Sequence, residues 1–219
     1  MKDSRNFIEI NYTMVTEFFQ EKLFDFYMSK MPIPFRKKIL KYRKWQDAQA
    51  SLLGKCLLTS AVLDGDFDRL RDIQFNEYGK PSIPGEFFFN ISHSRNVVLI
   101  AYGNVQLGID IEKKEDIQIE DFKTQMTQKE WDSVHSVPHK IEAFYEYWTQ
   151  KESAIKYVGK GLSIPLKSFE IIKGTHTIIE NDLLFFKKIF IDEDYVCNMA
   201  SKENFNDTQV KIQQIEYSL

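Results

Sequence analysis

The stretch Gly108-Ile109-Asp110-Ile111-Glu112 lies near the middle of this chain of 219 residues, and the expected fold follows from it. Its apolar residues alternate with Gly, Asp and Glu, which predicts a β-strand. A period of two sends Asp110 and Glu112 to the same face, with their backbones about 7 Å apart. Two like charges this close repel, so such a pair is tolerated best when the face is open to solvent or when a cation lies between the carboxylates.

A third acidic residue belongs to a predicted helix over residues 139–158, which ends at Gly159. Glu152 falls within the apolar stripe of this helix, where a carboxylate is costly unless something neutralises it. One candidate partner is Lys156, four residues further on. The other is a metal ion shared with Asp110 and Glu112, most plausibly Mg²⁺, which prefers oxygen ligands and substrate phosphates. The apolar residues of the stripe are Ile141, Phe144, Tyr145, Trp148, Ile155 and Val158.

Two lysines accompany Glu152 on the helix. Lys156 lies at the edge of the same face, whereas Lys151 points about 100° away and is expected to be solvated or to play a supporting part. A histidine-based zinc helix is rejected, because Pro138 separates His135 from His139 and the His-Glu-x-x-His pattern is absent.

The composition indicates an ordinary globular protein. Hydrophobic residues make up 43% and charged residues 28% of the chain, and the net charge of −3 argues against a dedicated nucleic-acid binder. The longest apolar run, 97–102, is too short to span a membrane, and no signal-like segment begins the sequence. Cys56 and Cys197 are too few for a disulfide framework, and Cys56 is expected in the core. We therefore expect a cytoplasmic protein.

The pattern of elements predicts helices followed by strands, twice over, with the changeover near residues 103–120. Gly103-Asn104 is typical of a hairpin turn between the runs 97–102 and 106–112. The expected elements are helices at 16–30, 36–63 and 139–158, strands within 71–102 and 168–196, a helical stretch reaching 133, and a closing strand at 210–217.

Four motifs in this order resemble those of the 4′-phosphopantetheinyl transferases, and in particular the Sfp-like (surfactin-type) branch. The resemblance covers roughly residues 30–190, with a looser match from Asp47-Ala48 to Leu52-Leu53-Gly54. The motifs are Tyr78-Gly79-Lys80-Pro81, Phe89-Asn90-Ile91-Ser92-His93-Ser94, the Gly108–Glu112 stretch, and Trp148–Lys156 continued by Gly159–Leu166.

The resemblance implies an α+β fold of two similar lobes with the active site in the cleft between them. We place the N-terminal lobe at 1–105 and the C-terminal lobe, with the metal site and helix 139–158, at 106–219. It also implies Mg²⁺-dependent transfer of 4′-phosphopantetheine from coenzyme A to a serine of an apo acyl- or peptidyl-carrier protein. The products are the holo-carrier and 3′,5′-ADP.

The resemblance assigns roles to individual residues as well. Glu152 is implied as the base and Lys156 as the lysine at the CoA pyrophosphate, and both are counted as catalytic. The implied metal ligands are Asp110, Glu112 and Glu152, and the implied CoA-binding residues are Lys38, Lys80, Ser92, His93, Asp110 and Lys156. The chain departs from the usual pattern at Gln49-Ala50-Ser51, where relatives often carry basic or polar residues, so one adenine- or phosphate-side contact to CoA is either missing or supplied differently.

The carrier protein is expected to dock on residues 159–190, with Leu162, Ile164 and Leu166 as apolar anchors beside Lys160 and Lys167. With two internal lobes the protein is expected to be a monomer that binds neither nucleic acid nor membrane. Two alternatives stay open: a catalytically silent homologue that binds CoA or a carrier, and a Mg²⁺-dependent phosphohydrolase. The sequence leaves open which carrier is the target, whether acyl-CoA is accepted and whether Mn²⁺ replaces Mg²⁺.

Overall fold

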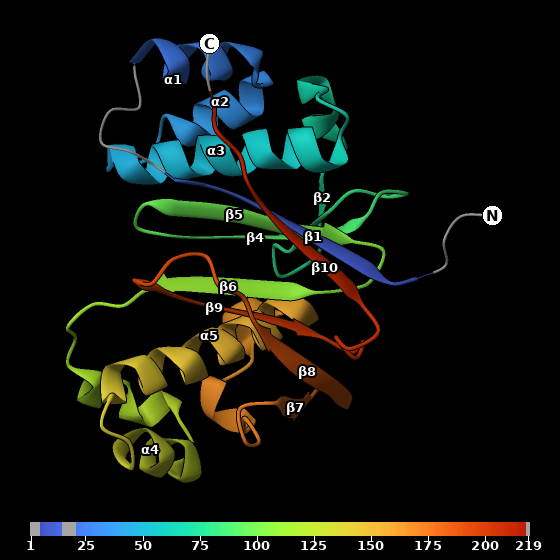
Figure 1. Cartoon of the computed structure of the whole chain (residues 1–219). Coiled ribbons are helices and arrows are strands. Elements are labelled where there is room, and N and C mark those ends of the chain that lie inside the picture. Colours follow the sequence, from blue (N-terminus) through green and yellow to red (C-terminus); the bar gives the residue numbers. More distant parts are fainter. Residues whose placement is uncertain (1–4, 15–20, 218–219) are drawn as a thin grey trace.

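The computed structural model describes residues 5–14 and 21–217, and within these ranges two four-stranded sheets form the centre of the fold (Figure 1). The first sheet has the strand order β10-β1-β5-β4, and its strands are β1 (Phe7–Met14), β4 (Phe88–Ser94), β5 (Val97–Gly103) and β10 (Gln209–Gln214). The second has the order β6-β9-β8-β7, and its strands are β6 (Gly108–Lys113), β7 (His176–Ile179), β8 (Asp182–Lys188) and β9 (Tyr195–Ser201). A short ribbon pairs β2 (Gln74–Phe75) with β3 (Pro81–Ser82).

Helices cover the outer face of each sheet, so the layers run helix, sheet, sheet, helix (Figure 1). This arrangement confirms the predicted α+β class with two sheets, each packed with helices. The helices over the first sheet are α1 (Glu21–Lys30), α2 (Ile33–Ile39) and α3 (Trp45–Val62), and those over the second are α4 (Gln128–His135) and α5 (Lys140–Val158). Short 3₁₀ segments occupy Phe67–Asp72, Ile119–Gln125, Gly161–Ser163 and Leu166–Ser168.

Strand β5 is buried along its whole length, which explains its unbroken apolar sequence. Val98 and Ile100 pack with α3 on one face, and Val97 and Leu99 pack toward the second sheet on the other. Residues of β6 and β9, including Ile109, complete this second apolar cluster between the sheets. The alternation of side chains in one strand therefore supplies two cores at once.

The edge strands β4 and β6 meet along a polar seam where the two sheets adjoin. Even-numbered side chains of β4 turn toward β6 and accept hydrogen bonds from its backbone amides, in place of an ordinary strand ladder. The donor and acceptor pairs are Ile109 to Asn90 (3.0 Å), Ile111 to Ser92 (3.4 Å) and Lys113 to Ser94 (3.0 Å). Each pair satisfies an amide that β9, on the other side of β6, does not reach.

The helix expected over 36–63 is wrong as a single element, because α2 and α3 are separate helices with residues 40–44 between them. Six basic side chains crowd into residues 36–44, and like charges three or four positions apart destabilise a helix. The first described helix, α1, matches the second half of the helix expected over 16–30. Phe18 and Phe19 of that prediction lie outside the described residues.

The hairpin predicted at Gly103-Asn104 is also wrong, because β5 and β6 belong to different sheets. A side chain at Gly103 would place its Cβ 2.1 Å from the Phe7 carbonyl oxygen, so glycine here allows β1 to approach closely. The Asn104 Oδ1 accepts a hydrogen bond from the Phe7 amide (2.8 Å). The Gly-Asn pair therefore fastens β1 to β5 where the chain passes between the sheets.

Helix α5 confirms the helix predicted at 139–158, and Gly159 ends it with a left-handed backbone (φ 78°). The predicted lobe boundary between 105 and 106 falls where the chain passes from the first sheet to the second. That boundary stays a prediction, and the final strand β10 returns to the first sheet, where it pairs in parallel with β1.

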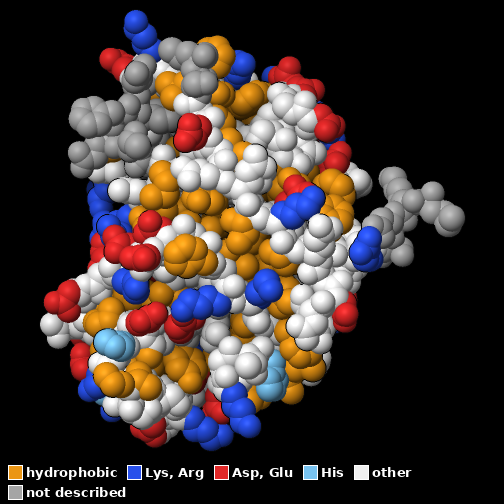
Figure 2. Space-filling model, in the orientation of Figure 1, with side chains coloured by type: hydrophobic (Ala, Val, Ile, Leu, Met, Phe, Trp, Pro, Cys, Tyr) orange, Lys and Arg blue, Asp and Glu red, His pale blue; other side chains and the backbone are white. Residues whose placement is uncertain are grey.

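Within the described ranges, no helix is both long and apolar enough to cross a membrane. Figure 2 shows acidic and basic side chains interspersed on the face drawn there.

The seam generates a testable prediction. Asn90→Ala should lower the free energy of unfolding by about 1–3 kcal/mol, because it leaves the buried Ile109 amide without an acceptor. Asn206→Ala, at an exposed asparagine, is the control and should change stability by less than about 0.5 kcal/mol. Chemical denaturation of both variants measures the difference, and equal stabilities would contradict the structural role of the seam.

Candidate active site

Strand β6 and helix α5 bring the predicted acids together in one cavity of about 310 Å³. Asp110 and Glu112 extend from β6, and Glu152 and Lys156 extend from the helix that packs on that strand. The residues that line the cavity are Ile91, Ser92, His93, Asp110, Glu112, Trp148, Glu152 and Lys156.

Lys156 is the cation at the centre of this cavity. Its Nζ donates to Asp110 Oδ1 (2.7 Å) and to Ser92 Oγ (2.8 Å), and Ser92 Oγ also contacts Asp110 Oδ1 (2.9 Å). The alternative interpretation, an ion pair between Glu152 and Lys156, is not what the described residues show, because Lys156 pairs with Asp110. Asp110 is buried, and its second oxygen, Oδ2, has no hydrogen-bond partner.

The surroundings of the two glutamates disfavour their charged forms. Burial, followed by the charge of Asp110, raises the pKa of Glu112 to about 7, although Ser94 Oγ donates to its Oε2 (2.7 Å). Burial and the Asp110 charge also raise the pKa of Glu152 above its usual range, against the opposing effect of Lys156. Both carboxylates would therefore be stabilised by a further cation in the cavity.

These residues fit a divalent cation bound through oxygen. Asp110 offers a buried oxygen without a partner, and Glu112 and Glu152 offer carboxylates whose charge is incompletely neutralised. Such a donor set suits Mg²⁺, which keeps some waters and binds through few carboxylates. Among the residues that the structure describes, no three His, Cys, Asp or Glu side chains are already arranged around a single ion position. The metal site therefore stays a prediction.

Ser92 and His93 occupy different surroundings, as their neighbouring positions in β4 require. Ser92 is buried in the seam, whereas His93 is exposed at the rim of the cavity. Partial desolvation and then the Lys156 charge lower the pKa of His93, while Asp47 at the start of α3 acts in the opposite direction. The histidine is therefore neutral near pH 7 and can donate a hydrogen bond to an anion at the rim.

Lys80 lies in an adjoining cavity of about 270 Å³ that shares Glu152 and Lys156 with the first. Its Nζ donates to the Tyr157 carbonyl oxygen (2.7 Å), and burial lowers its pKa to about 8. The side chain crosses Gly159 so closely that a Cβ there would lie 2.3 Å from Lys80 Cδ. The loop before β3 thus reaches across to the end of α5.

Lys38 is the one predicted site residue that lines neither of these two cavities. It is exposed on α2, where its charge acts on Lys55 of α3. Two residues that the sequence analysis did not assign belong to the site instead. Asn90 and Ser94 alternate with Ser92 along β4, and this period of two in polar residues was the signal that could have identified them.

Lys151 is not solvated, contrary to one of the two expectations. It is 1% exposed, its Nζ pairs with Glu130 of α4 (2.9 Å), and it donates to the carbonyl oxygens of Leu166 (2.8 Å) and Phe169 (2.7 Å). Glu130 caps α4 at Thr127 and accepts from the Ile171 amide, so the pair fixes residues 166–171 against α4 and α5.

Two of the three apolar anchors expected in the docking segment are also buried, as Lys151 is. Ile164 and Leu166 are buried in the core, and only Leu162, 85% exposed, is available to a partner. Their alternation resembled a surface pattern, but Ile164 and Leu166, which begins the 3₁₀ turn Leu166–Ser168, pack with Ile155 of α5 in one apolar cluster.

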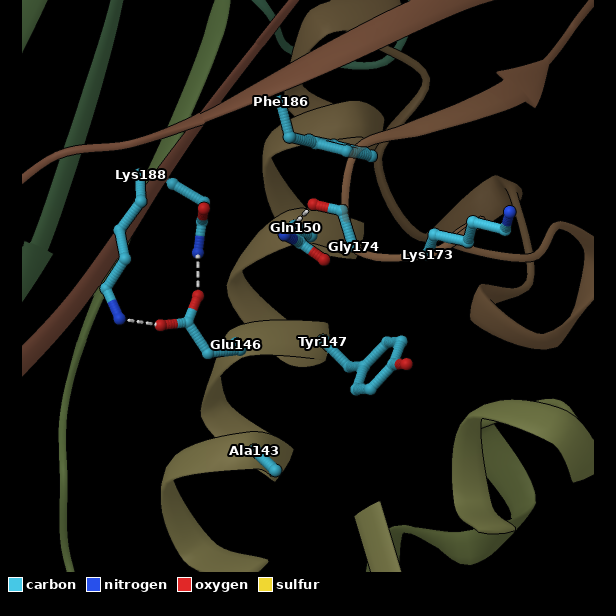
Figure 3. A pocket seen from close by; sticks show the side chains of 9 residues that line it. Ala143, Glu146, Tyr147, Gln150, Lys173, Gly174, Phe186 and Lys188 are labelled. Atoms are coloured by element: carbon cyan, nitrogen blue, oxygen red, sulfur yellow. Dashed lines mark hydrogen bonds and ion pairs between the residues drawn. The ribbon is translucent and has the colours of Figure 1, made fainter. Parts of the chain in front are cut away.

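The opposite flank of α5 borders a separate cavity of about 410 Å³ (Figure 3). Figure 3 shows Glu146 and Gln150 on successive turns of the helix, Glu146 paired with Lys188 and Gln150 donating to the Gly174 carbonyl oxygen (2.9 Å). The acid of this cavity, Glu146, is already neutralised by Lys188, in contrast to Glu112 and Glu152 in the first cavity.

An acid cluster with a central lysine, bordered by a second lysine and a histidine, defines a site for a phosphate-bearing ligand. Comparison with known proteins agrees with this class. Residues 106–201 match the model of the 4′-phosphopantetheinyl transferase superfamily. The 4′-phosphopantetheinyl transferase gsp of Aneurinibacillus migulanus is 31% identical over 223 residues, which cover 95% of this chain and 93% of that protein.

Other relatives have related names. The 4′-phosphopantetheinyl transferase Sfp of Bacillus subtilis (strain 168) is 37% identical over 151 residues, covering 66% of this chain and 67% of that protein. The L-aminoadipate-semialdehyde dehydrogenase-phosphopantetheinyl transferase of Xenopus laevis is 31% identical over 170 residues, covering 68% of this chain and 56% of that protein. The chain belongs to the 4′-phosphopantetheinyl transferase family.

The buried ion pair predicts a structural role for Lys151. Lys151→Met should lower the free energy of unfolding by about 3–5 kcal/mol, because it leaves the Glu130 charge buried without a partner. Lys167→Met, at an exposed lysine of the same region, should have little effect. The double variant Lys151→Met/Glu130→Gln should lose less than the sum of its single changes, and strict additivity in denaturation experiments would contradict the pairing.

The raised pKa of Glu112 predicts a pH dependence of stability in metal-free protein. The folded state holds a proton on Glu112 up to about pH 7, whereas the unfolded chain releases it near pH 4.5. The contribution is therefore full below pH 4.5 and is lost as the pH rises through 7, by about 2 kcal/mol after allowance for partial exposure. Denaturation with chelator present should show this loss of unfolding free energy in the parent protein and not in Glu112→Gln. If the unfolding free energies of the two proteins changed with pH in parallel, the assignment of the pH dependence to Glu112 would be contradicted.

Proposed function

We propose that this protein transfers the 4′-phosphopantetheine group of coenzyme A to a serine of an apo acyl- or peptidyl-carrier protein. The observation that carries the proposal is Lys156, held at 2.7 Å from Asp110 and 2.8 Å from Ser92 in a cavity that also contains Glu112 and Glu152. Membership of the transferase family supports the same reaction.

Coenzyme A binds across the two adjoining cavities in this proposal. Lys156 belongs to both, so it can contact the diphosphate, and Lys80 and His93 stand on either side to contact further phosphate oxygens. Ser92 and Asp110 hold the Lys156 ammonium in place, which positions the charge before the substrate arrives. This preorganisation supports a role for Lys156 in stabilising charge that develops on the phosphoryl oxygens.

Glu152 is the proposed general base. It lies in both cavities, and its raised pKa brings it closer to neutrality, as suits a group that accepts a proton. The carrier serine oxygen forms a bond to the β-phosphorus and its proton passes to Glu152. The bond to the bridging oxygen breaks, and 3′,5′-ADP leaves with the electron pair.

Asp110, Glu112 and Glu152 are the residues that would hold Mg²⁺. When bound, the metal would neutralise charge on the diphosphate oxygens, as is general for phosphoryl transfer.

The carrier is proposed to dock on residues 159–190. Leu162 is exposed there and lies between Lys160 and Lys167 in the sequence, so the segment offers an apolar contact and basic side chains to an acidic carrier helix. Lys160 pairs with Glu180, whereas Lys167 is exposed and has no ion pair among the described residues. We also propose a monomer that acts in the cytoplasm.

A direct assay tests the proposed reaction. The protein is incubated with coenzyme A, Mg²⁺ and a panel of apo-carrier proteins, and intact masses are read. Carriers should gain one 4′-phosphopantetheine, and a chelator should prevent the gain until Mg²⁺ is restored. A silent homologue would modify no carrier, and a phosphohydrolase would release phosphopantetheine from CoA when no carrier is present. Full transfer with excess chelator would contradict the proposal that Asp110, Glu112 and Glu152 hold a metal ion needed for the reaction.

The role of Glu152 gives a specific prediction. Glu152→Gln should reduce kcat by roughly 10²-fold or more, because the variant keeps the shape of the side chain and loses its basicity. Glu142→Gln, at an exposed glutamate of the same helix, is the matched control and should retain activity. Steady-state kinetics on both variants measure the effect. A kcat in Glu152→Gln equal to that of the parent protein would show that Glu152 is not the general base.

The proposed docking segment, residues 159–190, gives a further prediction. Lys167→Glu should raise the KM for carrier several-fold and leave the KM for coenzyme A nearly unchanged, since charge complementarity to an acidic partner is lost. Lys160→Glu should act in the same direction. Lys140→Glu, outside the segment, provides the control for net charge. Equal changes in both KM values for Lys167→Glu would place the carrier elsewhere.

A further inference from the structure

The position of the Glu152 carboxylate depends on the helix that carries it. Among the described residues, this carboxylate accepts no hydrogen bond and forms no ion pair. Lys156 on the same helix is different, because Asp110 and Ser92 hold its Nζ. The rotation of α5 about its own axis therefore decides whether the Glu152 carboxylate faces the acids of β6.

Close packing of α5 on β6 sets the separation of the two elements. A Cβ at Gly108 would lie 2.1 Å from the Ser153 carbonyl oxygen and 2.3 Å from the Tyr157 amide nitrogen, so helix and strand meet backbone to backbone. Glycine presents no side chain, and the apolar contacts around it have no preferred direction. This packing fixes the distance between helix and sheet and leaves the rotation of the helix to other contacts.

Asn198 of the interior strand β9 makes directional contacts with α5. Its Nδ2 donates to Thr149 Oγ1 (2.8 Å) and to Glu146 Oε2 (3.0 Å), so one amide group joins two successive turns of the helix. Thr149 Oγ1 donates in turn to the Tyr145 carbonyl oxygen (2.8 Å). Asn198 and Thr149 are 1% and 0% exposed, so water does not compete for these bonds.

The pairing of the second sheet places this contact beside the acids of β6. Asn198 is paired with Asp110 of β6 on one side and with Lys188 of β8 on the other. All three side chains of this row bond to α5, and Figure 3 shows Lys188 paired with Glu146 there. Asn198 is thus the member of the row next to Asp110.

Thr149 shares one side of α5 with Glu152 and Lys156, which follow it by three and seven residues. A bond that holds Thr149 against β9 therefore also turns Glu152 toward the neighbouring strand β6. Asn198 Oδ1 is buried without a hydrogen-bond partner, which costs stability. This cost indicates that the contacts of Asn198 Nδ2 do more than stabilise the fold.

We propose that Thr149 and Asn198 are positioning residues, whose hydrogen bond fixes the rotation of α5 and places the Glu152 carboxylate at the acids of β6. The inference rests on the proposed function, in which Glu152 is the general base and a metal ligand. A displacement of about 1 Å from the productive geometry can cost about 10²-fold in rate. Loss of the bond should therefore affect kcat more than it affects the binding of coenzyme A.

Steady-state kinetics of Thr149→Val test the proposal, because valine keeps the shape of the side chain and removes the hydroxyl. The kcat should fall at least about tenfold. The KM for coenzyme A should change by less than about twofold, because Lys156 and Lys80 keep their own hydrogen bonds. Thr149→Ser restores the hydroxyl and should recover most of the parent kcat. Asn198→Ala should reproduce Thr149→Val, and it is the second variant should Thr149→Val fold poorly.

Ser153→Ala is the matched control. It removes a buried hydroxyl of the same helix, and this hydroxyl bonds within α5, to the Gln150 carbonyl oxygen (2.8 Å). Its kcat should stay within about twofold of that of the parent protein, because no contact between α5 and β9 is lost.

Calorimetric titration with Mg²⁺ gives a readout that needs no transfer. The metal-free protein is titrated in the presence of coenzyme A and without carrier. Thr149→Val should bind Mg²⁺ about tenfold more weakly than the parent protein, as is general when a residue that orients a metal ligand is lost. Ser153→Ala should bind Mg²⁺ as the parent protein does.

Parent values of kcat and Mg²⁺ affinity in Thr149→Val, or equal losses in Ser153→Ala, would overturn the proposal. Failure of the proposed function would look different. The parent protein would then modify no carrier, while the loss of Mg²⁺ affinity in Thr149→Val would persist.

Discussion

The polar seam between β4 and β6 is the constraint on which the rest of the structure depends. Both strands lie at the edges of their sheets, so each would otherwise expose unpaired backbone groups. Asn90, Ser92 and Ser94 take the place of a neighbouring strand and satisfy three amides of β6. Three unsatisfied amides would cost several kcal/mol together, a large part of the stability of an ordinary domain.

The same seam builds the site. Ser92 accepts from the Ile111 amide and from Lys156, and it contacts Asp110, so one side chain joins both sheets and helix α5. Because β6 is fixed by its amides, its alternate side chains Asp110 and Glu112 must face α5. The acids are thus close together because the backbone places them there. Burial first, and then the charge of Asp110, raise the pKa of Glu112 at this position.

Local periodicity was enough to predict much of this arrangement. The alternation in 108–112 and the apolar stripe of 139–158 identified β6 and α5, and the helix end at Gly159 followed from glycine in the left-handed region. Six of the proposed site residues share one cavity for the same reason. Patterns that depend on distant partners were harder to interpret: Gly103-Asn104 serves close contact with β1, and no local signal distinguishes that from a hairpin turn.

Lys151 shows the same limit, because its burial depends on Glu130 and on carbonyl groups from residues 166 and 169.

Amide hydrogen exchange at Ile109, Ile111 and Lys113 tests the polar seam between β4 and β6 most directly. The account predicts that these amides exchange as slowly as those of Cys197 and Met199 in the interior strand β9, because all require global unfolding to open. Fast exchange at the three β6 amides, typical of an exposed edge strand, would contradict it.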